Sequence, residues 1–167
     1  MSIPLSLCRA VAATFAVVAF SAQAQTSAAP AQSSTSVWLS PGIYSRHFDR
    51  NKNLRDGNPG VGVEVGLARD HSLLAGTFIN SNNARTHYAG YAWRPLHWIW
   101  DGVDVSGGVI VAAFDGYPNY KNGGSFVAPL PVLAFEGKRF GVNVSIIPTL
   151  ANRTDGALSF QFKFKVW

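Results

Sequence analysis

Side chains that could perform chemistry lie at the ends of two segments of the chain. Arg46-His47-Phe48 ends the first extended segment, and Asn80-Ser81 ends the third. If both ends meet at one rim of the fold, a serine hydroxyl would lie near an imidazole that can take its proton. That pair is the minimum for acyl transfer through a nucleophile or an activated hydroxyl. The competing interpretation is that these are ordinary rim residues whose hydrogen bonds serve only the loops.

Basic residues cluster around the first loop, at Arg46, Arg50, Lys52 and Arg55. Arginine binds phosphate in a bidentate manner, so the cluster could hold lipopolysaccharide phosphates. The alternative is a solvated loop in which Asp49 and Asp56 are the partners of these cations. The four histidines are scattered, and the sequence has no metal-ligand spacing, phosphate loop or dinucleotide fingerprint. We therefore expect neither a metal nor a cofactor.

Eight segments bounded by turn residues would position these side chains: 37–48, 59–68, 72–80, 85–96, 103–113, 125–136, 140–149 and 157–166. The second alternates strictly between bulky residues (Val61, Val63, Val65, Leu67) and small or polar ones (Gly60, Gly62, Glu64, Gly66). Period two indicates β-strands. Segments of about ten residues, joined by alternately long and short connections, are typical of a transmembrane barrel.

We therefore predict an all-β fold, an eight-stranded antiparallel transmembrane β-barrel over 36–167. Its bulky face would meet lipid, and its small and polar face would line a narrow lumen. A soluble sandwich or a lipocalin-like barrel is the alternative, because alternation alone does not tell which face meets lipid. An even strand number places both termini on the periplasmic side, so loops 49–58, 80–84, 114–124 and 150–156 would be extracellular.

The start of the chain is typical of a secretory signal. Arg9 supplies a positive charge, an apolar run follows, and Ala22-Gln23-Ala24 fits a cleavage site, so we predict a signal peptide over 1–24. An uncleaved anchor is the alternative. We interpret 25–35 as a flexible leader. Cys8, the only cysteine, would leave with the signal, and loss of Arg9 would lower the formal charge from +5 to +4. Export makes a phosphate-rich membrane surface a better partner for this charge than nucleic acid. The expected location is the cell outer membrane.

Several motifs resemble the outer-membrane lipid A palmitoyltransferase family (PagP). They are Ala89-Gly90-Tyr91-Ala92-Trp93 with Arg94-Pro95-Leu96, then Pro129-Leu130-Pro131-Val132-Leu133, then Ile147-Pro148, with Asn80-Ser81 upstream. The resemblance runs from about Pro41 to the C-terminus. It implies an eight-stranded monomeric barrel that moves an acyl chain from a phospholipid to lipid A.

The resemblance also implies roles for individual residues. His47 matches the family's catalytic histidine if the first strand holds one extra residue after Pro41; without that shift, Ser45 or Arg46 takes the place. Ser81 matches the catalytic serine, whereas Asn80 stands where the family has an aspartate. Ala92, between Tyr91 and Trp93, falls at the floor of the acyl pocket. Independently of the resemblance, a proline deletes a ladder hydrogen bond, so Pro41, Pro129, Pro131 and Pro148 could open lateral gaps for a lipid tail; the alternative is simple strand-end or bulge placement. A lipid A deacylase and a barrel that binds lipid without turnover remain the alternatives.

Overall fold

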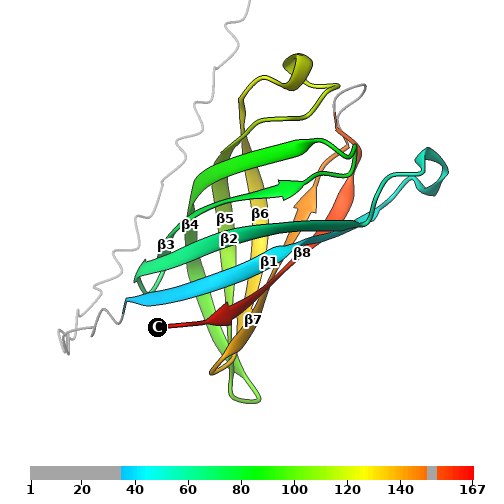
Figure 1. Ribbon diagram of the computed structural model, residues 1–167. Coiled ribbons are helices and arrows are strands. Elements are labelled where there is room, and N and C mark those ends of the chain that lie inside the picture. The colour runs from blue at the N-terminus through cyan, green and yellow to red at the C-terminus, as the bar shows by residue number, and fades with distance from the viewer. Residues whose placement is uncertain (1–34, 150–153) are drawn as a thin grey trace, which may run out of the picture. The chain divides into compact units, whose positions relative to one another are not determined.

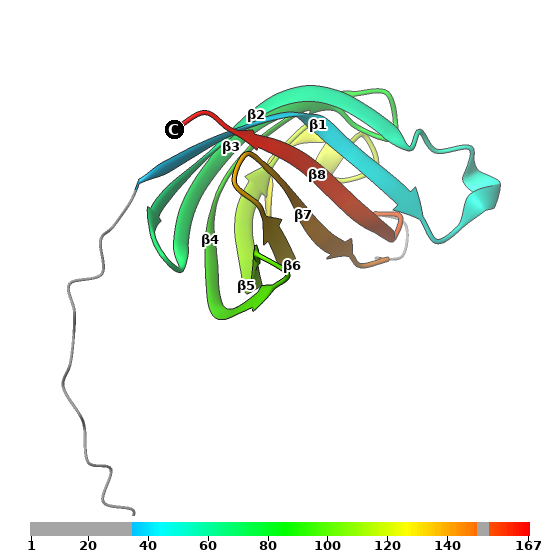
Figure 2. The ribbon, with the colours of Figure 1, turned by 90° about the horizontal axis from the view of Figure 1, so that it is seen from below.

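The computed structural model describes residues 35–149 and 154–167, so the predicted signal and most of the leader lie outside the described residues. Eight antiparallel strands close into a barrel in the order of the chain, with β8 paired to β1 (Figures 1 and 2). The strands are β1 (Ser36–His47), β2 (Gly57–Ala68), β3 (His71–Ile79), β4 (Arg85–Trp100), β5 (Val103–Phe114), β6 (Phe126–Glu136), β7 (Phe140–Ile147) and β8 (Ala157–Lys165). The predicted eight-stranded barrel is confirmed.

Long loops lie at one end of the barrel and tight turns at the other (Figure 1). Two of the long loops contain a short 3-10 helix, η1 (Arg50–Lys52) and η2 (Lys121–Gly123). The turn between β4 and β5 is only Asp101-Gly102, both with positive φ, which is the usual two-residue hairpin geometry. In the described part of the chain, no helix is long and apolar enough to cross a membrane.

β4 is longer than predicted. The expected end at Leu96 was wrong, because the strand continues to Trp100 and pairs with the start of β5. The register between β4 and β5 shifts between Trp93 and Leu96, where Pro95 lies. A bulge absorbs the proline, so the strand does not end there.

In β2 and β8, bulky side chains face outward, and small or polar ones face the lumen. Val61 and Phe162 are more than half exposed, whereas Glu64 and Lys163 on the same strands are buried. In these two strands the bulky face is thus the exposed one, whereas a soluble sandwich would bury it. The alternation seen in the sequence therefore correctly separates the outer wall from the lumen in β2 and β8.

Charged side chains fill the lumen near the tight turns. Glu64 accepts bonds from Arg94 (2.8 Å), Lys163 (2.9 Å) and Asn143 (2.8 Å), and Arg94 also reaches Glu136 (3.1 Å). Two carboxylates and two cations balance, so each buried charge has a partner. Above this cluster lies an apolar layer formed by Leu74, Phe78, Tyr88, Ala92, Ile110, Ala112 and Val132.

A bulge in β1 decides which side chains of that strand face the lumen. Leu39 pairs with Phe164 and Tyr44 with Phe160, so β1 holds one residue more than β8 over this stretch. Gly42 lies in the bulge with φ +132°, where a Cβ would overlap the backbone oxygen of Asn58. Trp38 is buried before the bulge and His47 after it, although they are an odd number of residues apart. The extra residue therefore turns His47 into the lumen.

Pairing between β6 and β7 is incomplete. It covers Val132–Glu136 of β6 only, although β6 begins at Phe126 and pairs with β5 over its full length. Pro129 and Pro131 lie in the part that β7 does not cover. Because the ladder with β5 continues past both prolines, their missing N–H groups fall on the side that faces β7. The wall is thus open between these two strands, toward the long loops.

Candidate active site

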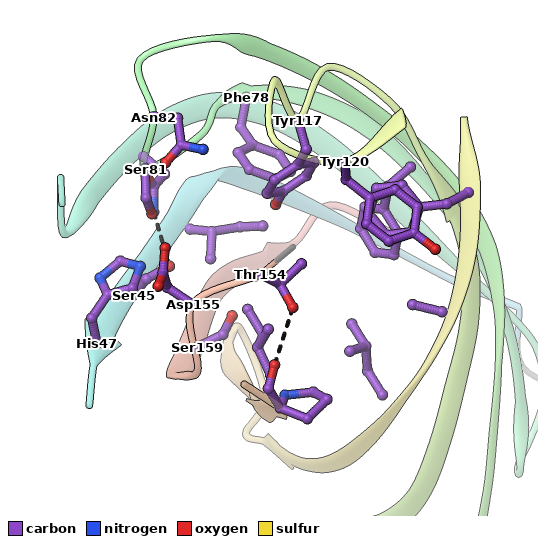
Figure 3. Close-up of a pocket in the computed structure, with 18 of the residues that line it drawn as sticks. Ser45, His47, Phe78, Ser81, Asn82, Tyr117, Tyr120, Thr154, Asp155 and Ser159 are labelled. Carbon is purple, nitrogen blue, oxygen red and sulfur yellow. Dashed lines mark hydrogen bonds between the residues drawn. The ribbon is translucent and has the colours of Figure 1, made fainter. Parts of the chain in front are cut away.

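The half of the barrel nearest the long loops contains a cavity of about 370 Å³ (Figure 3). This volume is within the range of small-molecule pockets. Its walls are largely apolar: Ile43, Phe114 and Leu130 line it and pack against the apolar layer beneath, and Phe78 of that layer also lines it. Val127–Leu130 of β6 and Ile147-Pro148 also line the cavity, and these residues flank the open stretch of wall.

His47 lines the mouth of this cavity and is paired with a carboxylate. Its Nδ1 lies 3.3 Å from Oδ1 of Asp56, and the imidazole is buried. Asp56 is fixed in turn by Arg50, whose guanidinium donates to both carboxylate oxygens at 3.2 and 2.9 Å. The hydrogen bond from Arg50 lowers the pKa of Asp56, so that this carboxylate stays ionised beside the histidine. A carboxylate in this position orients an imidazole and stabilises its protonated form.

Ser81 lines the same cavity from the loop between β3 and β4, as does its neighbour Asn82 (Figure 3). The backbone oxygen of Ser81 accepts a bond from the backbone N–H of Arg55 at 3.2 Å. This bond joins the loop after β3 to the loop after β1. The structure thus places His47 and Ser81 at one cavity, as the sequence predicts.

Asn80 does not line the cavity. Its side chain is fully buried, and its Nδ2 donates to Oγ1 of Thr86 (3.0 Å) and to the backbone oxygen of Gly116 (2.9 Å). Its Oδ1 accepts from the N–H groups of Asn82 and Ala84. Every polar atom of this amide is used in holding the turn that carries Ser81. An aspartate there would lose both donors, so Asn80→Asp is expected to destabilise the turn and not to complete a catalytic triad.

The basic residues of the first loop are paired within the protein. Arg46 and Arg50 both approach Asp56 (3.9 and 2.9 Å), and Lys52 pairs with Asp155. The contact of Arg55 is a long one, 3.4 Å to Oδ1 of Asn83. The hydrogen bond with Asp155 raises the pKa of Lys52. All four side chains are nevertheless exposed, so the cluster is both a solvated ion-pair network and a surface that phosphates can reach.

The three residues of the predicted acyl pocket divide between the two faces of β4. Ala92 is buried in the apolar layer under the cavity, whereas Tyr91 and Trp93 are exposed on the outer wall. Successive side chains of a strand point to opposite faces, so a run of three cannot all face the lumen. Of the three residues, only Ala92 faces the inside of the barrel. Its side chain lies in the apolar layer below the cavity and does not line the cavity itself.

Sequence reasoning missed Asp56 as the partner of His47, and it missed Asp155, which lines the cavity. One signal for Asp56 was present. Asp56-Gly57 starts a strand antiparallel to the one that His47 ends, so the two residues had to come close. In the described residues, no group of three or more His, Cys, Asp or Glu side chains could hold a metal ion.

The protein is thus a closed eight-stranded β-barrel with an apolar cavity in the half nearest the long loops and a histidine–carboxylate pair at the mouth of that cavity. No protein-family model matches the chain, and no curated protein matches it.

Proposed function

We propose that the protein is an outer-membrane lipid acyltransferase that moves an acyl chain from a phospholipid to lipid A. The observation that carries this proposal is the apolar cavity, with His47 and Ser81 at its mouth and an opening in the wall between β6 and β7. Such a cavity suits an aliphatic tail, and the side chains at its mouth suit chemistry on the ester at the end of that tail.

Membrane insertion is supported by the outer wall. Every strand exposes at least one large apolar or aromatic side chain there: Tyr44, Val61, Leu73, Leu96, Val111, Val127, Phe140 and Phe162 in chain order. A soluble monomer rarely exposes a continuous apolar surface of this kind, whereas a lipid-facing barrel requires one. The ion pairs of the first loop would then lie at the extracellular surface, within reach of lipid A phosphates.

The lateral opening supplies a route for the tail. A chain that entered from above would have to leave the hydrocarbon phase, which costs about 0.8 kcal/mol for each exposed methylene. Between β6 and β7 the tail can pass sideways, because no ladder hydrogen bonds need to break along the stretch that contains Pro129 and Pro131. Pro129-Leu130-Pro131, the first part of one motif that resembles the palmitoyltransferases, therefore lies in the open part of the wall.

In the proposed reaction, the ester C–O bond of the phospholipid breaks, and a new ester bond forms to a lipid A hydroxyl. His47 takes the proton from the attacking hydroxyl and returns it to the oxygen of the departing lysophospholipid. Asp56 stabilises the imidazolium between these two transfers. Ser81 is either the first attacking hydroxyl, through an acyl-enzyme, or a hydrogen-bond donor to the ester oxygen.

Mass spectrometry of lipid A tests the proposal in cells with and without the gene. The expected result is an added acyl mass that disappears in His47→Ala and Ser81→Ala variants present at equal amounts as heat-modifiable barrels. A lost acyl mass would mean deacylation with water as acceptor. An unchanged profile would contradict catalysis and leave a lipid-binding barrel.

A further inference from the structure

A tyrosine hydroxyl faces the cavity without a hydrogen-bond partner. Tyr117 belongs to the loop between β5 and β6, and its side chain lines the cavity opposite Ser45 and Ser159 (Figure 3). The hydroxyl forms no hydrogen bond with any described residue. It is not one of the closed-off polar atoms that lack a partner in the described residues, so it is open to the cavity. Burial raises the pKa of this phenol to about 12, and the hydroxyl therefore stays protonated as a donor.

The loop holds the ring of Tyr117 in one place. The backbone oxygen of Tyr117 accepts from the N–H groups of Tyr120 (2.9 Å) and Gly123 (3.1 Å). The ring packs edge-on against Phe126, with centroids 5.6 Å apart and planes at 75°. The donor is thus fixed before a ligand enters, and a fixed donor needs no reorganisation when charge develops on its partner.

The same loop is joined to the turn that carries Ser81. Nδ2 of Asn80 donates to the backbone oxygen of Gly116 at 2.9 Å. Asn80 directly precedes Ser81, and Gly116 directly precedes Tyr117. The two side chains therefore start from neighbouring points of the rim, and both line the cavity. Asn80 thus positions the hydroxyl of Tyr117 as well as that of Ser81.

The ester of a lipid is the group that matches this donor. A hydrocarbon tail cannot accept a hydrogen bond, so a hydroxyl that met only the tail would lose the bond that water gives it. The carbonyl oxygen of an ester is an acceptor and lies at the end of the tail, near the mouth. Among the described residues that line the cavity there is no lysine or arginine, so the lining offers no cation for the phosphate of the headgroup.

We propose that the O–H of Tyr117 donates to the carbonyl oxygen of the phospholipid ester and stabilises the oxyanion that forms on it. This inference rests on the proposed function of the cavity. The attacking hydroxyl oxygen bonds to the carbonyl carbon and gives its proton to His47, while the π electrons of the C=O bond move to the carbonyl oxygen. Tyr117 keeps its proton and holds that oxygen. The C=O bond then reforms, the C–O bond to the lysophospholipid breaks, and His47 returns the proton to the departing oxygen.

A kinetic measurement on the purified, folded barrel tests this role. Tyr117→Phe removes the hydroxyl and keeps the ring that packs on Phe126. We expect kcat for transfer from a phospholipid to lipid A to fall about 10²-fold, as for the loss of one oxyanion donor in other enzymes. KM should change little, because the donor binds the oxyanion more strongly than the ester. Tyr44→Phe is the matched control and should keep the full rate, since Tyr44 is exposed on the outer wall and does not line the cavity.

A binding measurement tests the contact without turnover. A fluorescent phosphatidylcholine occupies the full-length protein in detergent micelles without lipid A. The competitors are a diacyl phosphatidylcholine and its diether analogue, which share headgroup and chain length and differ in the carbonyl oxygens. We expect the ester lipid to bind about two- to tenfold more tightly than the ether lipid. The preference should disappear in Tyr117→Phe and persist in Tyr44→Phe.

A full rate of transfer in Tyr117→Phe, or equal competition by the ester and ether lipids, would overturn the inference and leave the proposed function intact. An ester preference that depends on Tyr117, in a protein that transfers no acyl chain, would support the carbonyl contact and overturn the proposed function. Absence of displacement by both lipids would overturn the two together.

Discussion

The carboxylate of Asp56 offers the sharpest test of the proposed chemistry. Asp56→Asn keeps the size of the side chain, and the amide oxygen can still accept a bond from Nδ1 of His47. What it removes is the negative charge beside the imidazole, which is needed only while the imidazole is protonated. The substitution should therefore lower the rate of turnover and leave binding of the acyl chain in the cavity unchanged.

The size of the effect follows from the geometry. A hydrogen bond to a charged group contributes about 1.5–3 kcal/mol, which corresponds to a rate loss of about 10- to 150-fold. The Nδ1–Oδ1 distance of 3.3 Å is longer than the distances usual for such bonds, so we expect the lower half of this range. In the Ser-His-Asp triad of serine proteases the same substitution costs about 10⁴ in rate, and that tighter pair gives an upper bound.

The assay is the initial rate of acyl transfer from a phospholipid to lipid A by purified, folded barrel. Asp49→Asn is the matched control, because Asp49 lies in the same loop and, among the described residues, its side chain accepts only from the N–H of Asn51, at 3.0 Å. We expect the control to keep the full rate. A full rate in Asp56→Asn, together with complete loss in His47→Ala, would refute the role of Asp56.

The pH dependence of the loop has a definite sign. The pKa of Asp56 in the folded protein is lowered from its ordinary 3.8, chiefly by the hydrogen bond from Arg50. Its contribution to stability is therefore fully present above pH 3.8 and is lost as the pH falls through the lower, folded value. Loss of activity at mildly acidic pH, well above that value, would accordingly not come from protonation of Asp56.

Three further outcomes can be checked. Gly42→Ala should lower the free energy of unfolding by about 1–3 kcal/mol, because its φ of +132° and the nearby oxygen of Asn58 leave no room for a Cβ; unchanged denaturation in detergent would contradict this. Replacing Pro129 and Pro131 together by valine should extend the β6–β7 ladder and slow turnover of bilayer phospholipid, but not of a short, water-soluble ester; equal effects on both substrates would argue against a lateral route. Glu64→Gln should cost about 3–5 kcal/mol of stability, since it leaves Arg94 and Lys163 with one carboxylate between them; a midpoint of unfolding equal to that of the unmodified protein would show that the cluster is not stabilising.

The barrel could be predicted from the sequence because its strands and turns follow local residue patterns. Period-two alternation in β2 and turn residues at regular intervals require no knowledge of distant contacts. The error at the end of β4 has the same origin. Pro95 is locally a strand terminator, and only its pairing with β5 tells that a bulge absorbs it.

The site could be predicted only in part, because its chemistry depends on how loops meet. His47 and Ser81 were accessible as residues at strand ends on one rim. The pairing of His47 with Asp56 depends on the path of the loop 48–56, and the use of Asn80 in a turn depends on contacts with Thr86 and Gly116. The resemblance assigned Asn80 by its position in the motif, whereas its hydrogen bonds assign it to the support of Ser81.

The two halves of the lumen differ: the half near the tight turns is filled by charged side chains, and the half near the long loops contains the cavity. Near the tight turns, Glu64, Glu136, Arg94 and Lys163 neutralise one another. The apolar layer lies on β3 to β6, whereas β7 and β8 carry the buried polar residues Asn143, Ser145 and Ser159. The half that is hollow is also the half in which β6 is not paired with β7, and in which the loops bring a carboxylate to a histidine. In the proposed function, the closed lower half would keep a rigid frame and the upper half would admit a tail from the side, so stability and access would fall at opposite ends of the same strands.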